Sequence, residues 1–141
     1  MTSRAYQGRT LVEGDAEGEI VASDRAFTFA HGVEPSTGLV SDVHSDIAGC
    51  QIRSKVLVYP HGKGSTTASA WFLEAVRDGN APAAIVTESV DLSAVIGSVL
   101  AWELYGKRIP VLSSFPDSFY SEARKSKRLR LLGNGRVELE T

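Results

Sequence analysis

The sequence has 141 residues, of which 43% are hydrophobic and 23% charged, so a single domain over residues 1–141 with a buried core is expected. A net charge of −2 provides no attraction to nucleic acid or an anionic membrane, and one cysteine excludes a disulfide framework or a cysteine-ligated metal site supplied by this chain alone. The first residues lack the apolar segment of a signal peptide and no apolar stretch could cross a bilayer, which predicts a cytoplasmic protein.

The first half of the chain is rich in glycine and turn residues, a pattern typical of short strands. The segment 13–18 is a plausible hairpin connection between the apolar runs on either side of it. Pro35 and two glycines predict a loop over 31–38. The strands expected in this half are Leu11–Val12, Glu19–Ala22, Ala26–Ala30 and one that begins at Leu39–Val40.

The second half alternates between strand and helix patterns. Helical spacing predicts one helix with an apolar stripe of Ala68, Trp71, Phe72, Ala75 and Val76. A second helix, capped by Asp91 and ended by Gly106, is expected to bury Leu92, Val95, Ile96, Val99 and Leu100. Strands are expected at Lys55–Tyr59, Pro82–Val86 and Ile109–Leu112, and two closing strands around Leu129–Leu132 and Val137–Leu139. The order predicts an α/β fold with a glycine-rich β half joined to a parallel β-α-β-α-β half.

The most informative segment is the glycine-rich loop between the strand ending at Tyr59 and the next helix. Backbone N–H groups at such a helix start can bind a carboxylate or phosphate, and they can stabilise a serine alkoxide. The loop contains Gly62, Lys63, Gly64 and Ser65, but its spacing is neither that of a Walker A loop nor that of a dinucleotide fingerprint. The pattern alone favours a simpler interpretation, in which Ser65 only caps the helix and the glycines permit a tight turn.

Other polar residues form no diagnostic group. The histidines His31, His44 and His61 lie on separate segments without metal-ligand spacing, which favours ordinary loop histidines. Possible acids or bases are Asp42, Asp46, Asp91 and Glu103, yet no paired spacing singles any of them out. The basic stretch Arg124–Arg130 is typical of a solvated face, although docking to RNA or to an acidic protein stays open.

Three segments together resemble one family. Residues 26–38 are similar to its Ser-Phe-Trp-Gly-Gly-Val-Asp-Pro-x-Thr-Gly signature, Gly62–Ser65 to its Gly-Arg/Lys-Gly-Ser loop, and Ala81–Val86 to its Ala-Pro-Ala-Ala-Ile run. The family is the small subunit of aconitase X, which resembles the swivelling β/β/α domain of aconitases. Ala30 and His31 depart from the signature, where Trp and Gly are usual.

The resemblance implies a lyase, specifically a dehydratase subunit that is inactive without a larger subunit in a heterodimer. That partner would supply iron or an iron–sulfur cluster, with no metal bound by this chain. Ser65 would be the catalytic base. Aconitases carry an arginine at the position of Thr67, so substrate carboxylate recognition would fall to other groups. The substrate-binding residues implied are Gly62, Lys63, Gly64, Thr66, Thr67, Thr28, His31 and Gly32.

Two substrates fit the resemblance, and the sequence favours one of them. Characterised members act on cis-3-hydroxy-L-proline in bacteria or on mevalonate 5-phosphate in archaea. The chain lacks the Lys/Glu excess of hyperthermophiles, which favours a mesophilic bacterial source and the hydroxyproline reaction. A function of another class also stays open, that of a stand-alone anion-binding or regulatory module.

Overall fold

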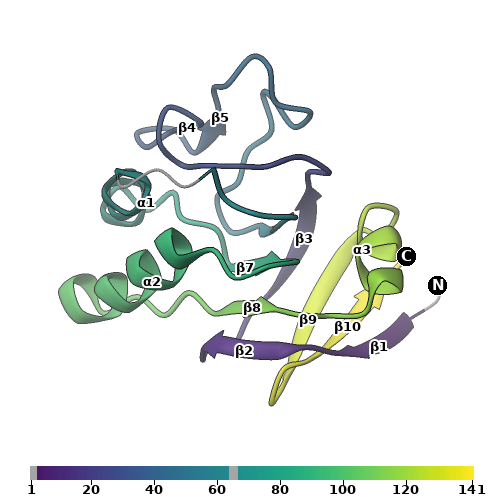
Figure 1. The fold of residues 1–141 in the computed structure, drawn as a ribbon. Coiled ribbons are helices and arrows are strands. Elements are labelled where there is room, and N and C mark those ends of the chain that lie inside the picture. The colour runs from purple at the N-terminus through teal and green to yellow at the C-terminus, as the bar shows by residue number, and fades with distance from the viewer. Residues whose placement is uncertain (1–2, 64–66) are drawn as a thin grey trace.

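The computed structural model describes residues 3–63 and 67–141, and its main element is a mixed eight-stranded sheet (Figure 1). In chain order, its strands are β1 (Ser3–Gln7), β2 (Arg9–Val12), β3 (Glu17–Ala22), β6 (Val56–Tyr59), β7 (Ala84–Thr87), β8 (Val111–Ser113), β9 (Arg128–Gly133) and β10 (Arg136–Glu140). Their spatial order is β1-β10-β9-β3-β6-β7-β8-β2. A separate pair comprises β4 (Val33–Glu34) and β5 (Leu39–Val40), and the helices are α1 (Ala68–Arg77), α2 (Leu92–Tyr105) and α3 (Asp117–Ala123).

Strands β6, β7 and β8 run parallel at the centre of the sheet and confirm the predicted β-α-β-α-β unit. Every residue of these three strands is buried, as their continuous apolar sequences predict for strands covered on both faces. The two predicted closing strands are also present as β9 and β10, which pair antiparallel. The architecture is therefore the expected α/β fold.

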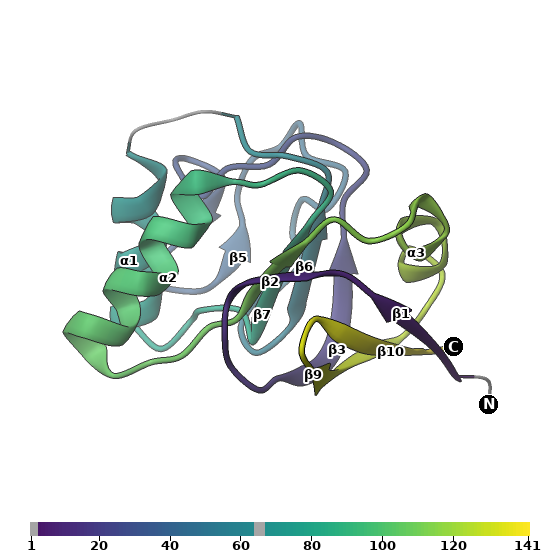
Figure 2. The same ribbon diagram turned by 60° about the horizontal axis from the view of Figure 1, so that its bottom comes forward.

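The sheet separates two hydrophobic clusters because alternate side chains of each strand point to opposite faces. On one face, Leu57 and Ile85 pack with Phe72 of α1 and with Ala94 and Ala101 of α2. On the opposite face, alternate residues of β6 and β7 pack with α3, β9 and β10. The strand residues are Val56, Val58 and Val86, and their partners are Phe119 of α3, Leu129 of β9 and Val137 of β10. Figure 2 shows α1 and α2 on one side of β6 and β7, with α3 on the other.

Two predictions for the first half are wrong. Strands β2 and β3 do not form a hairpin, because β2 pairs antiparallel with β8, and β3 pairs with β6 and β9. The segment Ala26–Ala30 is not a strand either, and its one ladder contact is an isolated bridge between Phe27 and Gly62. Its aromatic rings enter the core instead: Phe29 stacks on Phe72 with ring centroids 4.7 Å apart. The apolar residues of this segment are therefore buried in the core and do not form a strand of the sheet.

The buried face predicted for α2 is also wrong. The residues that pack inward are the small ones, Ala94, Gly97, Ser98 and Ala101. Leu92, Ile96, Val99 and Leu100 are exposed, and Val95 is only partly buried. Gly97 explains the orientation, because a Cβ there would overlap the ring of Phe72. Close approach of α1 and α2 therefore selects the small-residue face and leaves the large apolar side chains outside.

Strand β1 and helix α3 were not expected from the sequence. The Tyr6 ring of β1 packs edge-on against Phe119 of α3 at a centroid distance of 5.5 Å. The longest described helix, α2, has 14 residues, and none of the described helices combines the length and apolar character needed to cross a membrane.

Candidate functional site

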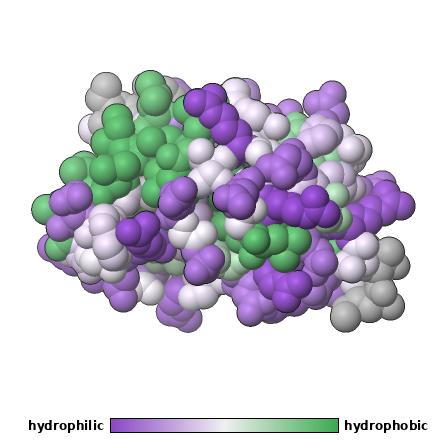
Figure 3. Space-filling view, turned by 90° about the horizontal axis from the view of Figure 1, so that it is seen from below, coloured by the Kyte–Doolittle hydropathy of each residue, from purple (hydrophilic) through white to green (hydrophobic). Residues whose placement is uncertain are grey.

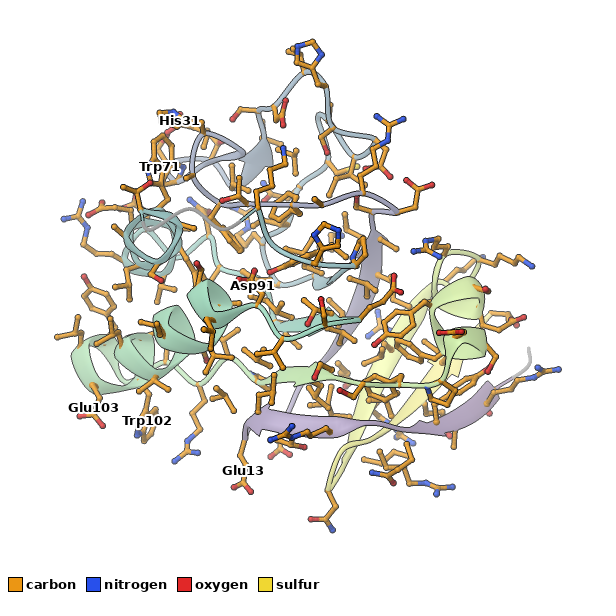
Figure 4. The ribbon with its side chains drawn as sticks, viewed as in Figure 1. Glu13, His31, Trp71, Asp91, Trp102 and Glu103 are labelled. Carbon is orange, nitrogen blue, oxygen red and sulfur yellow. The ribbon has the colours of Figure 1, made fainter. Side chains whose placement is uncertain are left out.

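The loops that follow β6 and β7 meet at the carboxyl edge of the parallel strands, where α/β sheets commonly bind ligands. Tyr59, the last residue of β6, donates its hydroxyl hydrogen to Asp91 Oδ2 at 2.7 Å. The other carboxylate oxygen of Asp91 accepts from the Ser93 backbone N–H at 3.1 Å, as the predicted N-cap of α2. Asp91 thus ties the start of α2 to the end of β6 (Figure 4).

The loop after β6 lies directly against Asp91. A Cβ at Gly62 would come within 2.7 Å of the Asp91 carboxyl carbon, so only glycine allows this approach. The backbone N–H of Phe27 donates to the His61 carbonyl at 3.0 Å and joins the same loop to the segment 26–30. These contacts position the next residue, Lys63, at the mouth of a cavity.

This cavity, which we call the Lys63 cavity, has a volume of about 210 Å³. Its lining residues are Arg25, Ala26, Phe27, Thr28, Gly32, Asp42, His44, Ser45 and Lys63. A smaller pocket shares Phe27, Thr28 and Lys63 and extends to Asp91 and Ser93 at the start of α2. Both hollows therefore adjoin Lys63, in the loop to which the family resemblance assigns the active serine.

The cavity combines both signs of charge. Lys63 Nζ lies 3.5 Å from Asp42 Oδ2 in an ion pair that remains partly exposed. The His44 backbone N–H donates to Asp42 Oδ1 at 2.9 Å. This bond is the main cause of a lowered Asp42 pKa; desolvation opposes it, and the Lys63 ammonium adds to it. At neutral pH the cavity consequently presents one carboxylate beside one ammonium group, with the Arg25 guanidinium at its wall.

The structure brings three of the predicted binding residues to this cavity, namely Thr28, Gly32 and Lys63. Two others lie elsewhere in the region: Thr67 is the N-cap residue of α1, a position the simpler interpretation assigned to Ser65, and His31 is exposed at a positive φ of 57°. The His31 ring contacts Trp71 at a centroid distance of 4.5 Å on the outer side of α1 and does not line the cavity (Figure 4). Gly64, Ser65 and Thr66 lie outside the described residues.

Sequence patterns alone did not find the cavity residues Arg25 and Ser45, and they did not group Asp42 with Lys63. The available signal was Asp42 two residues before His44, a spacing typical of an Asx turn. The two other candidate acids, Asp46 and Glu103, do not line the Lys63 cavity. Asp46 accepts hydrogen bonds from Ser23 Oγ at 2.5 Å and the Asp24 N–H at 2.9 Å, and Glu103 lies far along α2 (Figure 4).

Metal ligands do not converge in the parts of the chain that the structure describes, where no three His, Cys, Asp or Glu side chains could hold one ion. Cys50, the sole cysteine of the sequence, is half-buried and does not line the Lys63 cavity. An iron–sulfur cluster takes several thiolate ligands. The residues of this chain therefore do not fit a cluster.

A larger hollow, of about 710 Å³, lies at the opposite end of the parallel strands, where β8 begins and β9 turns into β10. Its charged lining residues are Glu13, Asp15, Arg108 and Arg136. None of the described residues predicted to bind substrate lines it, so the Lys63 cavity remains the candidate site.

Two buried tyrosines make alkaline pH destabilising. Burial, followed by the neighbouring Asp91 carboxylate, raises the pKa of Tyr59 well above its usual value, and burial raises the pKa of Tyr120 to about 12. Between pH ~10 and about 12, the unfolded chain loses protons that the folded protein retains, so each tyrosine lowers the free energy of unfolding by about 1.4 kcal/mol per pH unit. Urea unfolding measured above and below pH ~10 gives this slope. Tyr120→Phe should halve it, and an unchanged slope would contradict the assignment.

Comparisons with known proteins agree with this fold. The family described as "Aconitase X swivel domain" matches residues 5–139. The chain is 36% identical, over 95% of its length and 97% of the relative's, to the phosphomevalonate dehydratase small subunit of Thermococcus onnurineus. It is 37% identical, over 73% of its length but 18% of the relative's, to the cis-3-hydroxy-L-proline dehydratase of Pseudomonas aeruginosa. The crystal structure of holo aconitase X from Thermococcus kodakaraensis superposes with a TM-score of 0.83 at 31% identity, covering 98% of this chain and 99% of the other.

Proposed function

Because the chain belongs to the aconitase X swivel-domain family, we propose that it is the small subunit of a hydro-lyase that removes water from a small hydroxy acid. The observation that carries this proposal is the Lys63 cavity, beside the point where the chain enters α1. The named relatives that the chain matches are dehydratases or their small subunits. A larger subunit is accordingly the proposed partner.

Ser65 is the proposed base that removes the proton next to the substrate carboxylate. In the sequence it stands two residues after Lys63 and two before Thr67, the N-cap residue of α1. A serine alkoxide requires positive charge nearby, which the Lys63 ammonium and the start of the ten-residue helix α1 would supply. Since Cys50 alone cannot hold a cluster, the iron–sulfur centre of such an enzyme is proposed to lie on the larger subunit.

The charges of the cavity favour cis-3-hydroxy-L-proline as substrate. This amino acid carries one carboxylate and one ammonium group at neutral pH, and the cavity presents Lys63 beside ionised Asp42. A zwitterion can therefore pair with both side chains. A substrate that carries only negative groups would be attracted by Lys63 and Arg25 but repelled by Asp42.

Phosphomevalonate is the second candidate, favoured by relatives of similar length. Two phosphomevalonate dehydratase small subunits, from Thermococcus onnurineus and Methanosarcina acetivorans, are 36% and 34% identical over 95% and 94% of this chain. These identities are close to the 37% found for the hydroxyproline enzyme, so identity does not choose between the substrates. Arg25 and Lys63 would have to bind the phosphate and carboxylate despite Asp42.

Substitution of Asp42 should have opposite effects on KM for the two candidate substrates. For the assembled enzyme, we expect a higher kcat/KM with cis-3-hydroxy-L-proline than with phosphomevalonate. Asp42→Asn should raise KM about tenfold for the zwitterion, a loss of ~1.4 kcal/mol, and lower KM for the phosphorylated substrate. Steady-state assays with both compounds provide the measurement.

The matched control is Glu19→Gln, which removes another lysine-paired carboxylate, 3.3 Å from Lys55 and outside the cavity. It should change neither KM. Higher kcat/KM with phosphomevalonate would favour the second candidate, and no turnover of either compound by the assembled complex would contradict the hydro-lyase assignment.

A further inference from the structure

Helix α2 has large apolar side chains on the side that faces away from the core. Its inward face consists of small residues, and its fourteen positions include a single charged residue, Glu103. The side chains of Leu92, Ile96 and Val99 follow one another at helical spacing on the opposite face, with Leu100 beside them. We call these four residues the outer face of α2. Their exposed fractions are 67%, 50%, 48% and 37%.

The outer face is comparable in size to the largest apolar patch of a typical monomeric protein, and such patches often bind a ligand or a partner. With the adjoining Trp102, which is 45% exposed, it leaves on the order of 500 Å² bare, against ~800 Å² that each partner buries in a standard interface. Figure 3 shows hydrophobic residues gathered over α2 on this side of the molecule. Its polar border has Glu103 and Arg108, whose guanidinium lies 4.2 Å from the centre of the Trp102 ring. An apolar centre with an aromatic residue and a charged rim is the usual anatomy of a protein interface.

The outer face begins at the candidate site. Leu92, its most exposed member, directly follows Asp91, which lines the small pocket next to Lys63. The proposed reaction needs a second protein at this end of the sheet, because the chain has one cysteine and its described residues gather no set of metal ligands. Leu92 is therefore the member of the outer face that adjoins the candidate site along the chain, and Ile96 and Val99 follow it along α2.

We propose that the outer face of α2 is the docking surface for the larger subunit. This inference rests on the proposed function for the existence of that partner, and it assigns a place on the chain to the contact. The relative from Pseudomonas aeruginosa agrees with a permanent contact, since the matched segment forms 18% of that protein and the remainder belongs to the same polypeptide. The partner surface is expected to be apolar at its centre, with a cationic group opposite Glu103.

The test is the affinity between the two subunits, measured by calorimetry with the purified chain and the larger subunit of the same organism. Ile96→Glu combined with Val99→Glu should raise Kd at least a hundredfold, because two carboxylates would be buried without partners. Both positions are exposed and glutamate favours helix, so the isolated variant should stay folded, with an unfolding temperature lowered only slightly by repulsion between the new carboxylates and Glu103. Leu132→Glu is the matched control, since this residue is 42% exposed on β9, away from α2, and Kd should not change.

An unchanged Kd for the double variant would overturn the docking surface and leave the proposed reaction intact. The docking surface would also be overturned if the isolated wild-type chain forms a dimer and the double variant does not, because a second copy of the chain would then cover this face. Kd is independent of turnover, so a complex that assembles through α2 but dehydrates neither substrate would count against the proposed function alone.

Discussion

Ser65→Ala is expected to lower kcat of the assembled enzyme about a thousandfold while the two subunits still bind each other. Removal of a proton from carbon is slow without a positioned base, and general bases contribute about 10²- to 10⁴-fold to rate. Alanine lacks the hydroxyl but adds no bulk, so KM should change only slightly. Stopped assays with excess substrate measure kcat, and gel filtration verifies assembly.

Ser69→Ala provides the matched control for this substitution. Ser69 lies in the first turn of α1, and its hydroxyl donates to the Ser93 carbonyl of α2 at 2.9 Å. Its loss should lower the free energy of unfolding by about 1 kcal/mol and leave kcat within a few-fold of the wild type. Wild-type kcat in the Ser65→Ala complex would remove this serine as the base.

Asp91→Ala is expected to destabilise the chain by about 2–4 kcal/mol. It removes the N-cap of α2 and leaves the hydroxyl of Tyr59, which is 1% exposed, without its acceptor. The space left beside Gly62 would also loosen the loop that carries Lys63, so kcat/KM should fall as well. Urea unfolding of the isolated chain gives the stability, and assays of the complex give kcat/KM.

Asp91→Asn isolates the hydrogen bonds from the charge. Its side-chain oxygen can still accept from the Ser93 N–H, and its amide can donate to the Tyr59 oxygen, so most of the stability should remain. Equal losses in the alanine and asparagine variants would mean that the charge of Asp91, rather than its two hydrogen bonds, stabilises this edge of the sheet.

Strong local patterns predicted the parallel half of the fold correctly. The continuous apolar runs that became β6 and β7, the stripe buried by α1, and the caps of α2 at Asp91 and Gly106 all depend on residues close in sequence. Each pattern has a local cause, such as a capping carboxylate or a left-handed glycine at φ 65°. These local interactions do not depend on how the rest of the chain folds.

Patterns that depend on distant partners were less informative. Residues 13–18 are typical of a hairpin turn, yet β2 pairs with β8, about a hundred residues further along the chain. The candidate site has the same origin. The family resemblance implied Lys63, Thr28 and Gly32 as site residues, but Asp42, the carboxylate partner of Lys63, comes from another loop and was not grouped with them. Hydropathy cannot show which loops meet at the edge of a sheet.

Helix α2 shows most clearly which features local sequence determines and which features tertiary packing determines. Its composition established an apolar helix with defined ends, because capping and helix propensity are properties of neighbouring residues. Which side it buries was decided by the fit between Gly97 and the ring of Phe72, a contact between two helices. Close packing of α1 and α2 favours small residues at their contact, even when larger apolar residues are available on the same helix. The strands, helices and caps of the parallel unit thus follow from the sequence alone, whereas strand partners, the Lys63 cavity and the outward-facing apolar surface follow from tertiary packing.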